Sequence, residues 1–251
     1  MHGESRVEKM VSLRLLFVGN SLTYWKPGLD ALFREWGHDA AAVTEGGATL
    51  QILWDAGKAL NAIRSRLYDI VVLQDDLPEY GRASAAPFRK YVTLFVEAAR
   101  ESESTPIVLL THSYERLRHT RLNAIALAHQ EAARTLDVVV APSGLTIGYE
   151  GLAASTELGT LLSRDREHPL PAGMLLTALL VHAAVLDATG ASAPSAAQLE
   201  ELAVRAIEAG ALAGGASCAS PATLAAELAA LALSGWRWWS NYPTRPPAAQ
   251  T

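Results

Sequence analysis

Three polar residues in two distant segments have the types and the spacing that nucleophilic catalysis needs. Ser21 comes two residues after Gly19, at the end of an apolar run, and Asp165 precedes His168 by three positions. A carboxylate at that spacing can accept the proton on Nδ1 of the ring, which leaves Nε2 able to take a proton from a serine hydroxyl. Taken separately, Ser21 could merely cap a turn, and Asp165 and His168 could be a solvated loop pair.

Short apolar runs mark the strands that must carry these residues. They lack the polar alternation of half-exposed strands, which is typical of a parallel sheet covered on both faces. The runs are Leu13–Val18, Ile70–Leu73, Ile107–Leu110 and Val138–Val140, with a weaker one at Ala40–Val43. Segments with helical spacing lie between them, at 29–36, 49–66, 86–102 and 118–136. This alternation predicts a three-layer α/β/α fold around a doubly wound, five-stranded parallel sheet.

The predicted sheet places the serine where ligands of such sheets bind, at the carboxyl ends of the strands. Gly19 permits a tight departure from the first strand, and Ser21 then precedes a helix that begins near Pro27. A hydroxyl in that position lies close to unpaired backbone N–H groups, which suits a nucleophile whose oxyanion must be stabilised.

The chain after residue 140 is predicted to be mainly helical. We expect helices at Pro171–Leu186, at Ser195–Leu212 with Ser195 as N-cap, and at 221–233. The simplest division is an α/β domain over residues 1–213 and a helical, Trp- and Pro-rich extension over 214–251 that packs on it. Its Trp236, Trp238 and Trp239 could bind sugar rings, but packing onto the domain or onto a second copy in a homodimer is favoured.

Composition excludes several classes of function. The chain has 251 residues, a formal charge of −5 and no basic patch, so nucleic acid is not an expected partner. Its single cysteine, Cys218, cannot form an intramolecular disulfide, and we expect a cytoplasmic protein that does not engage a membrane. Glycine-rich phosphate loops and zinc-ligand spacings are missing from the sequence, so we expect neither a cofactor nor a metal.

Together, the serine and histidine segments resemble the SGNH-hydrolase superfamily, also called the GDSL-type esterases and lipases. The opening block Gly-Asn-Ser is similar to that of a bacterial branch in which Asn replaces the usual Asp, and residues 169–173 resemble the continuation of the closing Asp-x-x-His block. The likeness runs from about residue 12 to about residue 213. It implies a flavodoxin-like SGNH fold with Ser21 as nucleophile and Asp165 and His168 as the other members of a triad.

The resemblance also implies an oxyanion hole, in which this sequence departs from the family. A glycine after the second strand should donate its N–H, and Gly47 is the first choice, with Gly46 close behind. The third block usually carries a donor Asn, but counting from the strand end places Asp76 there. Since an ionised carboxylate cannot donate, Gln74 could supply the amide, Asp76 could be protonated, or the reaction could differ from plain ester hydrolysis.

The remaining candidates are residues that could line the substrate cleft. Asn20, Tyr24 and Trp25 adjoin the nucleophile, although packing at the start of a helix is an equally good interpretation for the two aromatic residues. His112 follows the fourth strand and could contact the substrate, but it lacks an obvious acid partner for a role as base.

These residues predict a serine ester hydrolase that forms an acyl-enzyme on Ser21. In the family that the chain resembles, substrates are often small acyl esters of carbohydrates or other polar alcohols, and an acetyl ester is the first expectation. An acyltransferase or biosynthetic tailoring enzyme using the same acyl-enzyme is the alternative. A non-catalytic binding module with a degenerate oxyanion hole is a third.

Overall fold

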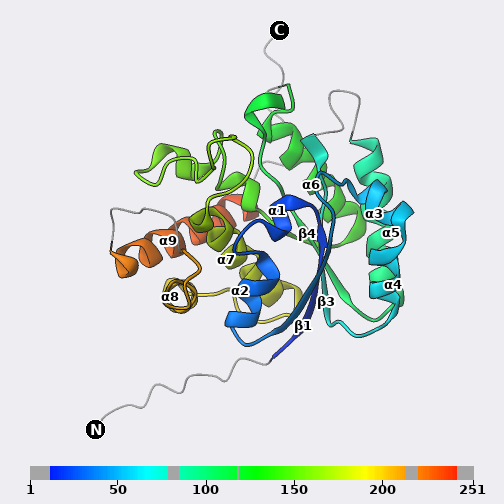
Figure 1. Cartoon of the computed structure of the whole chain (residues 1–251). Coiled ribbons are helices and arrows are strands. Elements are labelled where there is room, and N and C mark those ends of the chain that lie inside the picture. Colours follow the sequence, from blue (N-terminus) through cyan, green and yellow to red (C-terminus); the bar gives the residue numbers. More distant parts are fainter. Residues whose placement is uncertain (1–11, 79–84, 118, 213–219, 242–251) are drawn as a thin grey trace.

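The computed structural model describes residues 12–78, 85–117, 119–212 and 220–241, and its centre is a five-stranded parallel sheet (Figure 1). The strand order is β2-β1-β3-β4-β5. The strands are β1 (Arg14–Gly19), β2 (Asp39–Thr44), β3 (Ile70–Gln74), β4 (Thr105–Leu109) and β5 (Val139–Ala141). All four neighbouring pairs are parallel. This is the flavodoxin-like order, so the predicted doubly wound sheet is confirmed.

Alternation along each strand builds a separate hydrophobic core on each face of the sheet. In β1, Leu15 and Phe17 face one core, whereas Leu16 and Val18 face the other, and all four are fully buried. Burying each such side chain contributes about 1.5–3 kcal/mol. Helices α3 (Leu50–Ala56), α4 (Lys58–Arg64), α5 (Ala86–Glu101) and α6 (Leu122–Leu136) cover the second face. The first face is covered by α2 (Leu29–Glu35) and α7 (Pro171–Ala188).

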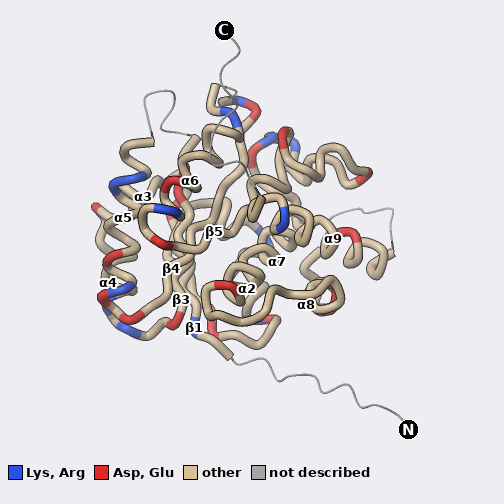
Figure 2. Tube along the Cα trace, turned by 180° about the vertical axis from the view of Figure 1, so that it is seen from behind, with Lys and Arg blue, Asp and Glu red and all other residues tan. Residues whose placement is uncertain are grey.

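Helix α7 is the most apolar element and lies inside the protein. It is long and apolar enough to span a membrane by composition alone, yet 72% of that span is buried. The pair α8 (Ala196–Glu208) and α9 (Pro221–Ser240) packs outside it. Figure 2 shows charged residues along α4 and α5, whereas α7 contributes only Asp187. Burial on all sides explains why α7 has no polar face.

Several observed helix boundaries differ from the predicted ones. The segment 49–66 forms two helices, because Gly57 adopts the left-handed conformation with φ of 75°. The predicted helix near Pro27 begins at Leu29, and a separate one-turn helix, α1 (Ser21–Tyr24), starts at the serine itself. The helix predicted to end at Leu212 ends at Glu208, although its N-cap Ser195 is confirmed and forms a capping box with Gln198.

The last helix is also longer than predicted, because α9 continues through the tryptophan cluster to Ser240. Trp236 packs against the core on one face of the sheet and Trp239 against the core on the other. Both also line a groove with residues 138–140, at the start of the edge strand β5. The end of α9 therefore lies along an edge whose backbone would otherwise be open for pairing. The junction at 213–219 and the Pro-rich end at 242–251 lie outside the described residues.

Candidate active site

The predicted nucleophile lies where the sheet reverses its winding. Strands β1 and β3 are neighbours, and the connections from them leave toward opposite faces of the sheet. In doubly wound folds a crevice opens at this point beyond the carboxyl ends of the strands. Here β1 leads into Asn20 and Ser21, and β3 leads into Asp75 and Asp76. The two segments therefore lie side by side.

The nucleophile turn is shaped by close packing around Gly19. A Cβ atom on Gly19 would collide with Thr23 Oγ1 and Gln74 Oε1, so only glycine fits. Asn20 is the N-cap of α1, and its Oδ1 accepts from the backbone N–H of Leu22 at 2.9 Å. Ser21 is consequently the first helical residue, and the N–H of that position has no acceptor within its own helix. That N–H is available to an oxyanion formed at Ser21.

The three predicted triad residues meet in one hydrogen-bonded row. Ser21 Oγ lies 2.9 Å from His168 Nε2, and His168 Nδ1 lies 2.8 Å from Asp165 Oδ2. A carboxylate only accepts hydrogen bonds, so Nδ1 carries the proton and Nε2 presents its lone pair to the serine hydroxyl. This is the tautomer that can deprotonate a nucleophile.

Asp165 is held as an anion by the loop around it. Its Oδ1 accepts from Ser163 Oγ at 2.6 Å and from the backbone N–H groups of Glu167 and His168 at 3.0 and 2.9 Å. Desolvation would raise the pKa of Asp165, but these hydrogen bonds, with that from the His168 ring, outweigh it and lower the pKa below its usual range. The group that orients His168 therefore stays charged well below neutral pH.

A second loop fastens the triad loop to the sheet. His112 follows β4, and its Nε2 lies 2.7 Å from the carbonyl oxygen of Glu167. Because a carbonyl only accepts, Nε2 must carry the proton. Burial lowers the pKa of His112 to about 4, so the ring is neutral at pH 7. Arg116 adds an ion pair with Glu167 at 2.5 Å. His112 is thus a structural anchor and not a second base.

Gln74 and Asp76, the side chains predicted to complete the oxyanion hole, form hydrogen bonds with other buried residues. Gln74 Oε1 accepts from the backbone N–H of Asn20 at 2.7 Å and from Thr23 Oγ1 at 3.0 Å, while its Nε2 donates to the Asp75 carbonyl at 2.9 Å. Asp76 accepts from Asn20 Nδ2 at 2.8 Å and from the Tyr114 hydroxyl at 2.7 Å.

This network changes how we interpret three of the predicted residues. Asn20, Gln74 and Asp76 are all buried and turned toward one another, so Asn20 is not a substrate contact. Their bonds instead fix the turn that carries Ser21. Neither Gln74 nor Asp76 is placed as the side-chain donor of an oxyanion hole.

The predicted glycine donor lies in a turn beside the nucleophile. Gly46 and Gly47 follow β2, the strand that pairs with β1, and Ala48 N–H closes the turn onto the Glu45 carbonyl at 3.2 Å. Gly47 has φ of 68°, which favours glycine. A Cβ atom on Gly46 would lie 3.1 Å from the hydroxyl of Tyr24, which connects this turn to the end of α1. Gly47 remains the predicted second backbone donor.

Two exposed aromatic side chains border the site. Tyr24 and Trp25 are the last residue and the C-cap of α1. The Trp25 ring stacks on the imidazole of His168, with centroids 3.9 Å apart and planes inclined by 20°. Trp25 therefore contacts His168 directly. The two predicted roles, substrate contact and packing at the start of a helix, do not include this contact.

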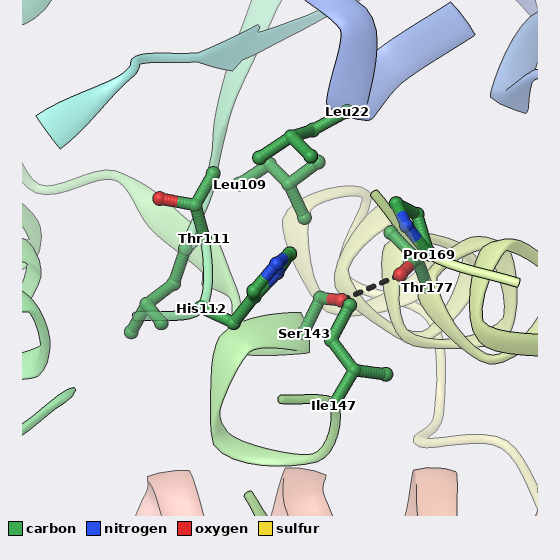
Figure 3. A pocket seen from close by; sticks show the side chains of 9 residues that line it. Leu22, Leu109, Thr111, His112, Ser143, Ile147, Pro169 and Thr177 are labelled. Atoms are coloured by element: carbon green, nitrogen blue, oxygen red, sulfur yellow. Dashed lines mark hydrogen bonds between the residues drawn. The ribbon is translucent and has the colours of Figure 1, made fainter. Parts of the chain in front are cut away.

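A narrow hollow lies close to the site in sequence, between residues that follow β1, β4 and His168 (Figure 3). Its free volume is about 10 Å³, room for about one water molecule, and its lining includes Leu22 and Pro169, the residues that directly follow Ser21 and His168. His112 projects into its centre in Figure 3, and a hydrogen bond of 2.6 Å between Ser143 and Thr177 closes one side. The other lining residues are Leu109, Leu110, Thr111 and Ile147.

Sequence reasoning missed two residues that position the triad and its neighbours. Ser163 bonds Asp165, and Tyr114 bonds Asp76. Ser163 lies two residues before Asp165, a spacing at which hydroxyl–carboxylate bonds are common in loops, but Tyr114 had no local signal. Across the described ranges, no group of three or more His, Cys, Asp or Glu side chains is arranged to hold a metal ion.

Several solved structures that share this architecture are named as hydrolases. No family model and no curated protein matches the chain. A candidate SGNH hydrolase from Slackia heliotrinireducens is 23% identical with a TM-score of 0.60, over 70% of this chain and 100% of its own. A candidate lipolytic protein of the G-D-S-L family from Desulfitobacterium hafniense DCB-2 is 18% identical with a TM-score of 0.56, over 68% and 98%.

A third structure carries a named substrate. It is Axe2, an acetylxylan esterase from Geobacillus stearothermophilus, which is 16% identical with a TM-score of 0.51 over 73% of this chain and 96% of its own. Identities this low establish the shared fold alone. The chain therefore has the α/β fold of the SGNH hydrolases, the family that its sequence resembles.

Proposed function

We propose that the protein is a serine ester hydrolase that forms an acyl-enzyme on Ser21. The observation that carries this proposal is the position of His168 between Ser21 Oγ at 2.9 Å and Asp165 Oδ2 at 2.8 Å. A serine, a correctly oriented imidazole and an anion behind it form the minimum arrangement for acyl transfer. The shared fold with named esterases supports the same reaction class.

The reaction follows from this row of hydrogen bonds. His168 Nε2 takes the proton of Ser21 as Oγ attacks the ester carbonyl, and Asp165 stabilises the imidazolium that forms. The imidazolium then protonates the leaving alcohol as the C–O bond breaks, leaving the acyl group on Ser21. Water attacks the acyl-enzyme with His168 again accepting a proton, and the carboxylic acid departs. Each proton that His168 accepts is returned within the same cycle.

The oxyanion site is simpler than a three-donor hole. The backbone N–H groups of Ser21 and Gly47 are its proposed donors, while Gln74 and Asp76 are committed to the network around Asn20. Loss of one donor typically lowers kcat by roughly 10²–10³-fold. We therefore expect a slower hydrolase than one with a complete hole.

The narrow hollow lined by Leu22 and Pro169 favours a small acyl group. Its described lining is buried, apolar on most sides and adjacent in sequence to both Ser21 and His168. A free volume of about 10 Å³ leaves no room for a long acyl chain, so we expect an acetyl or similarly short one. We propose acetyl-like esters of carbohydrates or other polar alcohols as substrates, a class that includes the one named for Axe2.

Hydrolysis of p-nitrophenyl acetate by wild type and by Ser21→Ala tests the reaction. The variant should lose activity to the level of background hydrolysis, and a fluorophosphonate should label wild type but not Ser21→Ala. Equal rates in the two proteins would remove Ser21 from the mechanism. A folded wild type that neither hydrolyses the ester nor takes the label would favour the binding module.

Product analysis with added alcohols or amines separates hydrolysis from acyl transfer. Free acetate as the main product supports the hydrolase, and acetylated acceptor as the main product supports the transferase. A cytoplasmic location and a homodimer formed through the tryptophan-rich helix α9 stay predictions of the sequence.

A further inference from the structure

The indole of Trp25 covers one face of the proposed base, His168. The two rings are stacked with centroids 3.9 Å apart and planes inclined by 20°. The backbone N–H of Trp25 also donates to the carbonyl oxygen of Ser21 at 2.7 Å. Ser21, the first residue of α1, and Trp25, its C-cap, are therefore joined by one helical turn.

The face contact supplies a restraint that the hydrogen bonds of His168 do not. The bonds to Ser21 Oγ and Asp165 Oδ2 lie at opposite ends of the imidazole and hold its two nitrogens. The ring can still tilt about the line that joins those nitrogens. An indole stacked on its face opposes this tilt, because any rotation of the imidazole would break the parallel contact.

The surroundings of the triad loop make such a restraint useful. The Asp165 side chain is 47% exposed and that of His168 is 19% exposed, so neither is enclosed by the protein core. The loop itself is fixed by contacts such as the 2.7 Å hydrogen bond from His112 to the Glu167 carbonyl, which positions the backbone but not the imidazole plane.

We propose that Trp25 is a positioning residue for His168, and that its indole also stabilises the imidazolium formed when Ser21 attacks the ester. The positive charge appears on a ring already in contact with an aromatic face, which attracts cations. The benefit arises mainly as the charge forms, so it belongs to the transition state and should appear in kcat. This inference rests on the proposed hydrolase function.

The test compares Trp25→Phe, Trp25→Leu and Trp25→Ala with p-nitrophenyl acetate. Trp25→Ala should lower kcat by about 2- to 30-fold, the range of reported cation–π effects, with little change in KM. Phe should recover part of the loss because it retains an aromatic face. Leu should recover less, since it covers the ring without attracting its charge.

The control is Trp238→Ala in helix α9. Trp238 is 37% exposed and Trp25 is 38% exposed, so both substitutions remove an indole of equal exposure. Trp238→Ala should leave kcat unchanged, and the thermal unfolding of both variants should show that they remain folded.

A double-mutant cycle separates positioning of His168 from a general effect on α1. In the His168→Ala background, Trp25→Ala should leave the residual rate unchanged, because the ring that it positions is absent. An equal loss in both backgrounds, or full activity of Trp25→Ala, would overturn the inference. These outcomes differ from failure of the proposed function, which is reported by Ser21→Ala retaining wild-type activity.

Discussion

Replacing Asp165 by Asn should inactivate the triad by forcing His168 into the wrong tautomer. Three donors converge on Oδ1 of Asp165, namely the Ser163 hydroxyl and the backbone N–H groups of Glu167 and His168. An asparagine would satisfy them only with its carbonyl oxygen at that position. Its NH2 group would then face His168 Nδ1, which would have to become an acceptor and move its proton to Nε2. The ring could no longer deprotonate Ser21.

The size of the effect follows from the alternative orientation of the amide. If the NH2 group faced the loop instead, the two backbone N–H groups would lose their acceptor, at about 1–3 kcal/mol each. A total of roughly 2–6 kcal/mol corresponds to a loss of about 30- to 10⁴-fold in rate. Because the Asp165 side chain is 47% exposed, water can replace part of the lost bonding. We therefore expect a loss near the lower end of this range, about 30-fold, which is smaller than the roughly 10⁴-fold loss known for a buried triad aspartate.

The assay is kcat/KM for p-nitrophenyl acetate, measured for wild type, Asp165→Asn and Ser163→Ala. Ser163→Ala removes one donor to Asp165 but keeps the carboxylate, so its loss should be much smaller. A rate for Asp165→Asn within tenfold of wild type would refute the argument that the loop dictates the orientation of this side chain. Thermal unfolding of each variant checks that the loop has not collapsed.

Four further predictions follow from buried contacts. Burial lowers the pKa of His182 to about 4 in the folded protein. Below about pH 6.5 this histidine is protonated more readily in the unfolded state, so the free energy of unfolding falls as the pH drops. Between pH 7 and 5, the free energy of unfolding of His182→Leu, measured by urea titration, should fall by about 2 kcal/mol less than that of wild type. Asp76→Asn should lower, not raise, kcat/KM and Tm, because its amide would face Asn20 Nδ2. Ile147→Ala should shift the ester preference from acetate toward butyrate in a chain-length series, with about 2–5 kcal/mol less stability by urea titration. Gly19→Ala should lose both solubility and fluorophosphonate labelling.

Much of the fold could be predicted because each strand is a short, unbroken apolar run. Strands buried on both faces need no alternation, and that pattern locates all five strands to within two residues of their observed ends. The helix boundaries were harder to predict. Gly57 ends α3 through a left-handed conformation, while the apolar spacing of 49–66 continues across it. The tryptophans of α9 looked irregular in sequence, but Trp236 and Trp239 are helical residues that contact opposite cores.

The site could be predicted in part, and the missing part is side-chain direction. The local motifs around Ser21, and around Asp165 and His168, were enough to predict that the three residues lie together. Asp76 does follow strand β3 as predicted, but its carboxylate turns toward Asn20 and Tyr114. The contact between Trp25 and His168 joins two residues from distant parts of the chain. Local spacing predicts the direction of neither the Asp76 nor the Trp25 side chain. Both directions depend on which residues the fold brings close to these side chains.

The network around Asn20 and the stack on His168 together bear on how this site would perform the proposed reaction. The turn that carries Ser21 is held at its start by Asn20, through Gln74 and Asp76, and its end at Trp25 lies against the base. The Gln74 amide that helps to fix the start of the turn is the side chain that could otherwise have donated to an oxyanion. In the proposed reaction, rate enhancement would then come mainly from holding Ser21 and His168 in reacting geometry, which can supply several kcal/mol. Rigidity of α1, more than the number of oxyanion donors, is thus the property on which the proposed reaction depends.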